Sequence, residues 1–460
     1  MKKIVKFVIY SICALLAIGC ESEEPIVFQG IRIGGKVTRI ELSAATISDI
    51  GQTSATLSTE ALTLDGNLPI TQHGHVWSSV NQEPTTSDSK TEFGELTVAG
   101  IFITELENLV PNTTYFVRSY VITASGTGYS NQINAFTTSD APFDVLVINE
   151  GNFFSGDGSL STYQSFTREV NLSAFAAANG FPIGATLQNI LPYNNQMYMV
   201  TNAPDKLEIL DPETLESIDI INAGFENPIG FAAVGTKGYV SNWGDISTAF
   251  GPNPDSYITV IDLETNLITG TIDLNSRPQE LLAFGDKVYI ANEGGSSISV
   301  IDTNTDLITD IVTESGPSEL ILDANEHIWA ICTGGFLVEI DPLSGLVVQT
   351  IPNVEVSGFD EKMTVSGDGN TIYFLSVASF PSTETKVFEF EITSTTAPSE
   401  ALIEGENFYG IGIHPASNTL YIGNSNGFIS NGEVLLYDTE GNELDDFNTG
   451  IGPNGFVFVD

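Results

Sequence analysis

Basic residues are scarce in this sequence of 460 residues. Only 15 lysines and arginines accompany 59 aspartates and glutamates, which gives a formal net charge of −44 at pH 7. A surface of this sign repels phosphate backbones and other anions. Nucleic acid is therefore excluded as a partner, whereas cations and neutral or amphipathic ligands remain compatible with the charge. We interpret the acidity mainly as a source of solubility, with a dedicated cation store as the alternative.

Long hydrophobic runs are absent after the first 20 residues, so no transmembrane helix is expected. At the N-terminus, Lys2 and Lys3 precede an apolar stretch over residues 7–18, which is too short to span a bilayer comfortably. Charged, apolar and small residues in this order are typical of a secretory signal peptide, which we predict over residues 1–19. The mature protein is therefore expected outside the cytoplasm.

The predicted signal ends in Ala17-Ile18-Gly19-Cys20, which resembles the lipobox of bacterial lipoproteins. The resemblance implies that the Cys20 thiol is acylated and anchors the chain to a membrane. The next residues, Glu-Ser-Glu-Glu over 21–24, resemble the acidic signal that sends lipoproteins of Bacteroidota to the outer face of the outer membrane. We therefore expect a lipid-anchored outer-membrane protein that faces the cell exterior. An ordinary secretory peptide with an incidental cysteine is the alternative.

Cysteine is almost absent. Of the three cysteines, Cys13 would leave with the signal peptide and Cys20 would carry lipid. Cys332 then has no partner, so no disulfide framework is expected. The fold must be stabilised by its own hydrophobic core, and the mature chain is long enough for two domains.

Short alternating strands and turns, without helical periodicity, follow an acidic linker over residues 20–36 and fill residues 37–139. This pattern predicts a β-sandwich. The run over residues 109–120, with its Pro-Asn-Thr-Thr-Tyr turn, resembles the second half of fibronectin type III domains found in Bacteroidota lipoproteins. The resemblance implies that the Tyr115 ring packs on the core while its hydroxyl bonds to the preceding connection.

Histidine is also rare, with four residues in total. His73 and His75 fall on one face of a predicted strand, a spacing that is compatible with a metal ion. We interpret them as structural, because no carboxylate, cysteine or third histidine is predicted beside them. The sandwich is most simply a spacer between the anchor and the rest of the chain.

Internal repeats decide the fold of residues 143–460. Six units, each with a hairpin that ends in an acidic residue, recur with a period of 39 to 51 residues. Four short strands in this length are typical of a propeller blade, which must pack against neighbours because a lone sheet cannot bury both faces. The terminal acids are Asp211, Asp262, Asp302, Asp341, Glu391 and Asp438.

The two ends of this region supply a further sheet. Residues 455–459 read as an innermost strand without its hairpin, whereas residues 145–149 and 159–163 read as a hairpin without its innermost strand. Joining them closes a ring and removes exposed sheet edges. The sequence therefore predicts an all-β protein with a seven-bladed β-propeller over residues 143–460.

Two segments of this region, the hairpin over residues 149–161 and Val-Ser-Asn-Trp-Gly-Asp over 240–245, are similar to the YncE-like surface propeller lipoproteins of Bacteroidota. That group includes lipoproteins that capture corrinoids and pass them to a TonB-dependent transporter. It also includes many members with no assigned ligand. The resemblance implies a corrinoid as the leading ligand and a TonB-dependent transporter as a partner.

In that architecture, the loops between strands two and three and between strands four and one emerge on one face, where ligands usually sit. Here these loops carry aromatic and amide side chains, which suit a large ligand rich in carbonyl and amide groups, such as a corrinoid or a glycan. For each asparagine alone, a turn-stabilising role is the favoured alternative. Glu280 and Asn454 lie in the same loops. The candidate ligand-binding residues are Asn149, Glu150, Phe153, Phe154, Asn202, Asn242, Trp243, Arg277, Asn292, Glu293, Phe408, Tyr409 and Asn424.

Catalytic motifs are missing: no Gly-x-Ser-x-Gly elbow, P-loop or dinucleotide fingerprint occurs. His327 and His414 are interpreted as structural, and Asp157 and Asp368 lie in Asp-Gly turns that hairpins use without Ca²⁺. We predict a binding protein without cofactor or metal rather than an enzyme. Three hypotheses stay open: ligand capture at the surface, a protein-interaction or glycan-binding scaffold, and, least favoured, a propeller hydrolase or lyase.

Overall fold

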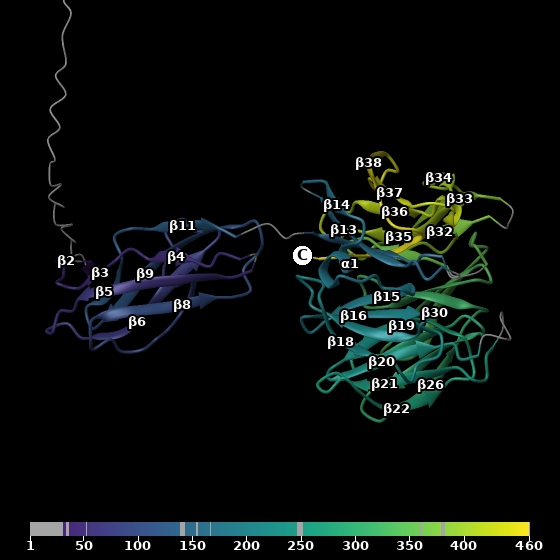
Figure 1. Cartoon of the computed structure of the whole chain (residues 1–460), viewed down its shortest axis with the longest axis horizontal. Coiled ribbons are helices and arrows are strands. Elements are labelled where there is room, and N and C mark those ends of the chain that lie inside the picture. Colours follow the sequence, from purple (N-terminus) through teal and green to yellow (C-terminus); the bar gives the residue numbers. More distant parts are fainter. Residues whose placement is uncertain are drawn as a thin grey trace, which may run out of the picture. The chain divides into compact units, whose positions relative to one another are not determined.

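A computed structural model describes residues 31–33, 36–51, 53–138, 143–152, 155–165, 167–245, 252–358, 361–378 and 382–459. The chain divides into two compact units, residues 1–141 and 142–460 (Figure 1). The signal peptide, Cys20 and most of the linker lie outside the described residues, as do Phe153 and Phe154. In the described part of the chain, no helix has the length and apolar character needed to cross a membrane.

Among its described residues, the first unit contains a two-stranded sheet of β1 and β2 and two larger antiparallel sheets whose inner faces share buried hydrophobic clusters. One sheet has the order β3-β5-β4 with β8 on β5, and the other has the order β10-β9-β6-β7 with β11 on β9. Alternation of buried and exposed residues along β5 and β8 sets which face meets the core. The strands are β1 (Arg32–Ile33), β2 (Lys36–Val37), β3 (Glu41–Leu42), β4 (Thr46–Ser48), β5 (Ala55–Thr63), β6 (Ile70–Ser78), β7 (Ser89–Lys90), β8 (Gly100–Leu106), β9 (Thr114–Thr123), β10 (Gly126–Tyr129) and β11 (Asn134–Thr137).

The predicted role of Tyr115 is confirmed. Its ring is buried and stacks on Phe136, with centroids 5.7 Å apart. Its hydroxyl accepts a hydrogen bond of 3.0 Å from the backbone N–H of Val110, in the connection that precedes β9. The ring therefore stabilises the core while the hydroxyl fixes the turn.

The second unit consists of four-stranded antiparallel sheets, seven of them among the described residues. The first sheet joins the two ends of the unit, with the order β14-β13-β12-β39; the other six each use four consecutive strands. The first three sheets comprise β12 (Val145–Asn149), β13 (Ser159–Gln164), β14 (Glu169–Asn171) and β39 (Pro453–Phe458); β15 (Thr186–Tyr193), β16 (Gln196–Asn202), β17 (Lys206–Leu210) and β18 (Ser217–Ile221); and β19 (Pro228–Val234), β20 (Lys237–Asn242), β21 (Tyr257–Asp262) and β22 (Leu267–Asp273).

The remaining four sheets follow in chain order. They comprise β23 (Pro278–Phe284), β24 (Lys287–Asn292), β25 (Ser297–Asp302) and β26 (Leu307–Val312); β27 (Pro317–Leu322), β28 (Ile328–Cys332), β29 (Phe336–Asp341) and β30 (Leu346–Pro352); β31 (Met363–Val365), β32 (Thr371–Val377), β33 (Glu384–Glu391) and β34 (Ile403–Glu406); and β35 (Phe408–Ile413), β36 (Leu420–Asn424), β37 (Glu433–Tyr437) and β38 (Glu443–Asn448). Among the described residues, the helical segments are α1 (Ala174–Asn179) and the 3₁₀ turn η2 (Asn426–Phe428).

The sheets are arranged in a ring, as in a β-propeller. The innermost strands β15, β19, β23, β27, β31, β35 and β39 each contact the next, and β39 contacts β15. The pairing predicted for the chain ends is present: β39 runs antiparallel to β12, with Leu146 opposite Val457 and Val147 opposite Phe456. The C-terminal residues thus supply the innermost strand of the first sheet.

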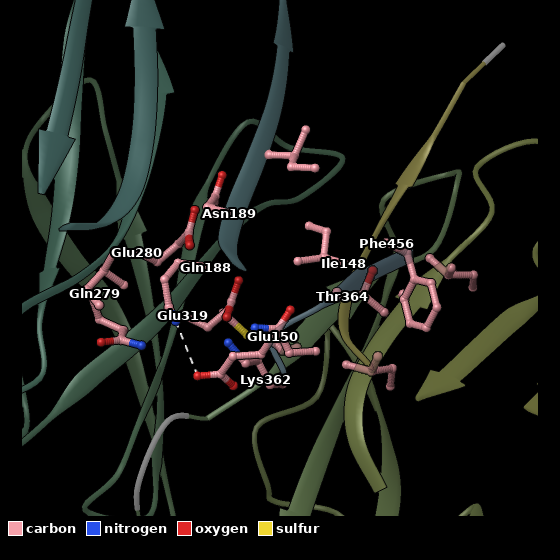
Figure 2. Close-up of a pocket in the computed structure, with 18 of the residues that line it drawn as sticks. Ile148, Glu150, Gln188, Asn189, Gln279, Glu280, Glu319, Lys362, Thr364 and Phe456 are labelled. Carbon is pink, nitrogen blue, oxygen red and sulfur yellow. Dashed lines mark hydrogen bonds between the residues drawn. The ribbon is translucent and has the colours of Figure 1, made fainter. Parts of the chain in front are cut away.

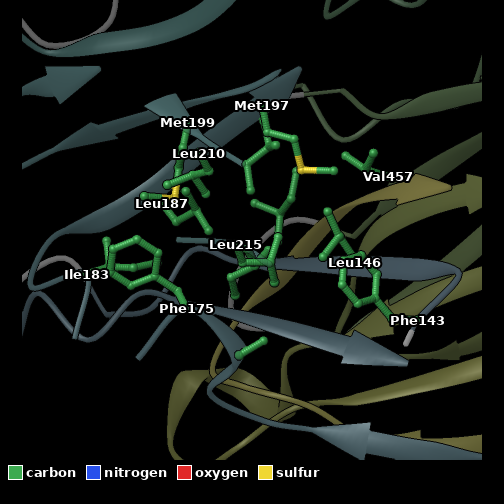
Figure 3. Close-up of a cluster of buried hydrophobic side chains, with 14 of the residues drawn as sticks. Phe143, Leu146, Phe175, Ile183, Leu187, Met197, Met199, Leu210, Leu215 and Val457 are labelled. Carbon is green, nitrogen blue, oxygen red and sulfur yellow. The ribbon is translucent and has the colours of Figure 1, made fainter. Parts of the chain in front are cut away.

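Buried side chains between consecutive sheets form the core of the ring. The second and third strands are almost wholly buried because both faces of each sheet meet a neighbour, whereas outer strands such as β22 face solvent. At the junction of the first and second sheets, Leu146 and Val457 pack with Met197, Met199 and Leu210, and α1 adds Phe175 (Figure 3). Burial of this kind drives the closure of the ring.

Closure by β39 predicts that Val457→Asp is strongly destabilising. The substitution places an unpaired charge in the cluster between the first and second sheets, which should lower the free energy of unfolding by roughly 3 kcal/mol or more. Leu307→Asp, on the outer strand β26 where the side chain is 68% exposed, is the control and should change it by less than about 0.5 kcal/mol. Chemical denaturation of both variants measures the difference, and equal effects would argue against closure.

Candidate functional site

A cavity of about 320 Å³ lies along the axis of the ring. Every one of the seven sheets contributes to its lining, from Ile148 and Phe456 in the first sheet to Ile411 in the last. It is therefore the central channel of the propeller, and we call it the channel cavity.

Charged and amide side chains gather at one end of the channel cavity. Glu150 directly follows β12, Glu280 and Glu319 lie near the start of β23 and β27, and Lys362 directly precedes β31. Because β12 runs antiparallel to the innermost strand β39, its end and the starts of the innermost strands meet at the same end of the channel. Figure 2 shows these side chains around the cavity, with Gln188 among them.

Both oxygens of the Glu150 carboxylate accept hydrogen bonds. Its Oε1 accepts a hydrogen bond of 3.2 Å from Gln188 Nε2, and its Oε2 accepts a short hydrogen bond from the Tyr409 hydroxyl. Its backbone N–H donates to the carbonyl of Gly452, 2.8 Å away, just before β39. These contacts join three sheets and fix the Glu150 carboxylate at the end of the channel cavity that Glu280, Glu319 and Lys362 also line. We call this end the channel mouth.

Lys362 is positioned by its neighbour Glu361, which is fully buried. The Glu361 carboxylate accepts hydrogen bonds from the backbone N–H groups of Ser357 (2.9 Å) and Gly358 (2.6 Å). The Glu361 N–H donates to Ser318 Oγ at 3.1 Å, which ties the connection before β31 to the adjacent sheet. The backbone at Lys362 is thereby fixed, so a single cationic side chain is presented among carboxylates.

A second cavity of about 450 Å³ adjoins this end of the channel, between the sheets that contain β32 and β35. Its lining is mostly apolar and includes Leu375, Val377, Phe408 and Phe428. The Tyr409 and Phe428 rings meet edge to face, with centroids 4.9 Å apart and planes at 81°. We call this space the side cavity. Lys362 lines both it and the channel cavity.

Comparison with known proteins places most of the chain in one family. Residues 144–458 match the model described as "Domain of unknown function (DUF5074)". The chain belongs to the DUF5074 family. Among proteins with curated descriptions, none matches this sequence.

Solved structures resemble the DUF5074 chain at low sequence identity. A quinoprotein alcohol dehydrogenase-like protein from Bacteroides thetaiotaomicron is 14% identical, with a TM-score of 0.55 over 90% of this chain and 99% of the other. Hydrazine synthase from Kuenenia stuttgartiensis is 17% identical, with a TM-score of 0.45 over 57% of this chain and 85% of the other. At such identity the first likeness supports the β-propeller fold alone.

Three predicted site residues meet at the channel mouth of the DUF5074 unit: Glu150, Phe408 and Tyr409. A fourth, Asn424, supports them, because its Oδ1 accepts a hydrogen bond of 2.9 Å from the N–H of Asn426 at the start of η2. Phe153 and Phe154 lie outside the described residues.

Four other predicted asparagines have a structural role, which corrects their interpretation as ligand-binding residues. Each is buried and is the last residue of the second strand of its sheet. The side-chain amide bonds within the sheet, where it satisfies buried groups instead of facing a ligand. The hydrogen bonds are Asn149 Nδ2 to Ser161 Oγ (2.9 Å), Asn242 Nδ2 to Thr259 Oγ1 (3.0 Å), Asn292 Nδ2 to Ser299 Oγ (2.8 Å), and Thr186 Oγ1 to Asn202 Oδ1.

Trp243, Arg277 and Glu293 form a separate cluster between the third and fourth sheets. The Arg277 guanidinium carbon lies 4.1 Å from the Trp243 ring centroid, and one guanidinium nitrogen lies 3.5 Å from Glu293 Oε2. The indole N–H donates to the carbonyl of Pro278 at 2.8 Å. This cation–π and ion-pair cluster binds its members to one another, and none of the three lines the channel cavity or the side cavity.

The sequence missed Gln188, Glu319 and Lys362, which complete the charged end of the channel. Each sits near the start of an innermost strand, where no turn signal or motif distinguishes it from other polar residues. The repeat pattern could have identified these residues, because aligning the repeated units places all three positions near the start of an innermost strand, beside the axis of the ring.

The histidines are engaged in hydrogen bonds within the fold. His75 is buried, with Nε2 2.9 Å from Thr59 Oγ1 and Nδ1 2.8 Å from Thr104 Oγ1. In the DUF5074 unit, His327 Nδ1 lies 2.6 Å from Glu339 Oε1. Asp323, His327 and Glu339 lie close enough together for their side chains to hold a metal ion. However, the Asp323 carboxylate already accepts hydrogen bonds from the Trp329 indole N–H and the backbone N–H of His327.

Burial lowers the pKa of His75 from its usual 6.5 to about 4, with a further contribution from the neighbouring His73. The folded state therefore favours the neutral ring, and this stability is present above pH 6.5 and is lost as the pH falls towards 4. Acidification from pH 7 to about pH 4 should remove about 3 kcal/mol from the first unit. Chemical denaturation across this range, with His75→Gln as the control, measures the effect; an equal pH dependence in both proteins would refute the assignment.

Proposed function

We propose that this protein is a cell-surface lipoprotein whose DUF5074 unit is a seven-bladed propeller that binds a ligand at its channel mouth. One observation carries the proposal: Glu150, Tyr409 and Lys362 converge where the polar channel cavity meets the apolar side cavity. Cavities that combine apolar walls with a few fixed polar groups are typical of ligand sites.

The chemistry of this mouth favours a large ligand that is rich in neutral hydrogen-bonding groups. Carboxylates accept hydrogen bonds, glutamine amides both donate and accept them, and the aromatic rings offer contact area at little entropic cost. A corrinoid, with its peripheral amides and broad ring, meets this description, and it is the ligand that the resemblance to surface propeller lipoproteins implies. Delivery to a TonB-dependent transporter would follow from the same resemblance.

The location rests on the N-terminal sequence. A lipid on Cys20, followed by Glu21 and further acidic residues, would hold the chain on the outer face of the outer membrane. The first unit, with its two larger sheets and the Tyr115 hydrogen bond, fits a fibronectin type III-like spacer between the anchor and the propeller.

A scaffold role is the alternative, and exposed apolar residues on the outer strands favour it. Ile218, Leu267, Leu307 and Leu346 lie on β18, β22, β26 and β30 and are each more than half exposed. Apolar side chains repeated around a rim are a feature of protein-interaction surfaces. A catalytic role has less support, because the sequence contains no Gly-x-Ser-x-Gly elbow, P-loop or dinucleotide fingerprint.

Calorimetry of the mature protein with cobinamide and cyanocobalamin tests the proposed ligand. We expect binding of at least one, and a loss of about tenfold or more in affinity for Tyr409→Ala, because an aromatic anchor and a hydrogen bond are removed. Tyr193→Ala is the matched control, since Tyr193 bonds to Gly235 away from both cavities, and its affinity should not change. If neither corrinoid releases or absorbs heat on titration, the proposal that the ligand is a corrinoid is wrong. If the Tyr409 and Tyr193 variants bind with equal affinity, the ligand does not bind at the channel mouth.

Membrane attachment is tested by Cys20→Ser. Without the thiol no lipid can be added, so the protein should move from the membrane fraction to the soluble fraction. Cys332→Ser, which alters the one described cysteine, a buried thiol in β28, is the control and should leave attachment unchanged. Retention of the Cys20 variant in membranes would contradict the anchor.

A further inference from the structure

The side cavity is a built space with the dimensions of a ligand pocket. Its volume of about 450 Å³ lies within the range of small-molecule sites, and its walls are largely apolar. The cavity is partly open to solvent, so a ligand can reach it, and Lys362 lines both this cavity and the channel cavity.

One wall of the side cavity is held in an unfavourable backbone conformation. Phe428 has φ of 60°, in the left-handed region that bulky residues avoid, and it follows Asn426 and Gly427, which also have positive φ. The turn is fixed by Asn424, which accepts from the Asn426 N–H. Side chains held in such conformations are concentrated at binding sites, where the surrounding structure compensates for the strain.

The Phe428 ring packs closely against Gly452, which directly precedes β39. A Cβ at position 452 would lie 2.5 Å from Phe428 Cε1, so only glycine leaves room for the ring there. Gly452 is the residue whose carbonyl accepts the Glu150 N–H. The aromatic wall of the side cavity and the carboxylate of the channel are therefore positioned by the same segment.

Polar residues interrupt the apolar lining of the side cavity. Lys362 lines it together with hydroxyl-bearing residues such as Thr383, and the Tyr409 ring forms part of its wall while the Tyr409 hydroxyl donates to Glu150. Among the described lining residues, Lys362 supplies the charged hydrogen-bond donor. A free anion is disfavoured by the surrounding carboxylates and the net charge of −44.

We propose that the side cavity binds an apolar ring of an uncharged ligand whose acceptor oxygen, a carbonyl or amide, receives a hydrogen bond from Lys362. This inference rests on the proposed function and names the ligand chemistry of that site. It requires no covalent step.

Propionyl(dimethylamino)naphthalene, an uncharged fluorophore with a ketone acceptor, serves as the probe for the full mature protein. Binding should shift its emission to shorter wavelength, because the naphthalene leaves water, and should give saturable fluorescence. Naphthylmethylammonium and naphthoate, which carry the same ring with a positive or negative group, should displace it about tenfold less effectively than unlabelled naphthamide, which keeps a neutral acceptor.

Variants locate the probe. Val377→Trp fills the cavity and should abolish binding, and Phe428→Ala should weaken it about tenfold through the lost ring contact. Lys362→Met should shift the bound emission further to the blue, because the ketone loses its donor, a change that a merely structural role of Lys362 would not produce. Ile429→Ala, next to Phe428 but 90% exposed, is the control and should leave binding unchanged.

Two results overturn the inference: undiminished binding to Val377→Trp, which would place the probe outside the side cavity, or equal displacement by the ammonium compound. Failure of the proposed function looks different. Glu319 lines the channel cavity and not the side cavity. If cobinamide binds and Glu319→Gln weakens that binding, while the probe does not bind, the pocket inference fails by itself. If the probe binds as expected and no corrinoid does, the corrinoid is removed and the side cavity stands.

Discussion

The pairing of β39 with β12 is the interaction on which the DUF5074 unit depends. It brings Leu146 beside Val457 and supplies the first sheet with its innermost strand. That sheet has buried clusters on both faces, one shared with the second sheet and one with the last. Without β39 both clusters lose a partner, and the ring that hides the faces of the other sheets opens.

The same pairing builds the functional end of the channel. Glu150 follows β12 and bonds through its N–H to Gly452, directly before β39. Gly452 makes room for Phe428, which packs on Tyr409, which in turn donates to the Glu150 carboxylate. Closure of the ring and construction of the candidate site are thus one event, and a chain with an open ring would have neither.

The repeats allowed the ring to be predicted from the sequence, because four strands recur at a near-constant period and the two chain ends are complementary. The candidate site was predicted in part. Glu150 lies in a loop with turn signals, and the aromatic pair Phe408 and Tyr409 follows the turn residue Asn407 at the start of β35. Glu319 and Lys362 also lie at the starts of innermost strands, but no turn signal marks them, and they become neighbours of Glu150 only through the ring. The asparagines were misread because an asparagine that ends the second strand of several sheets forms a similar hydrogen bond within its own sheet.

Hydrogen–deuterium exchange along the full chain tests ring closure most directly, with the backbone amides of β39 (Pro453–Phe458) as the decisive group. Within its sheet this strand is hydrogen-bonded to β12 alone, whereas β24 is paired on both sides. The account predicts that β39 amides directed at β12 exchange as slowly as those of β24, because both open only when the unit unfolds. Exchange of β39 at the rate of an unstructured chain, with β24 still protected, would contradict it.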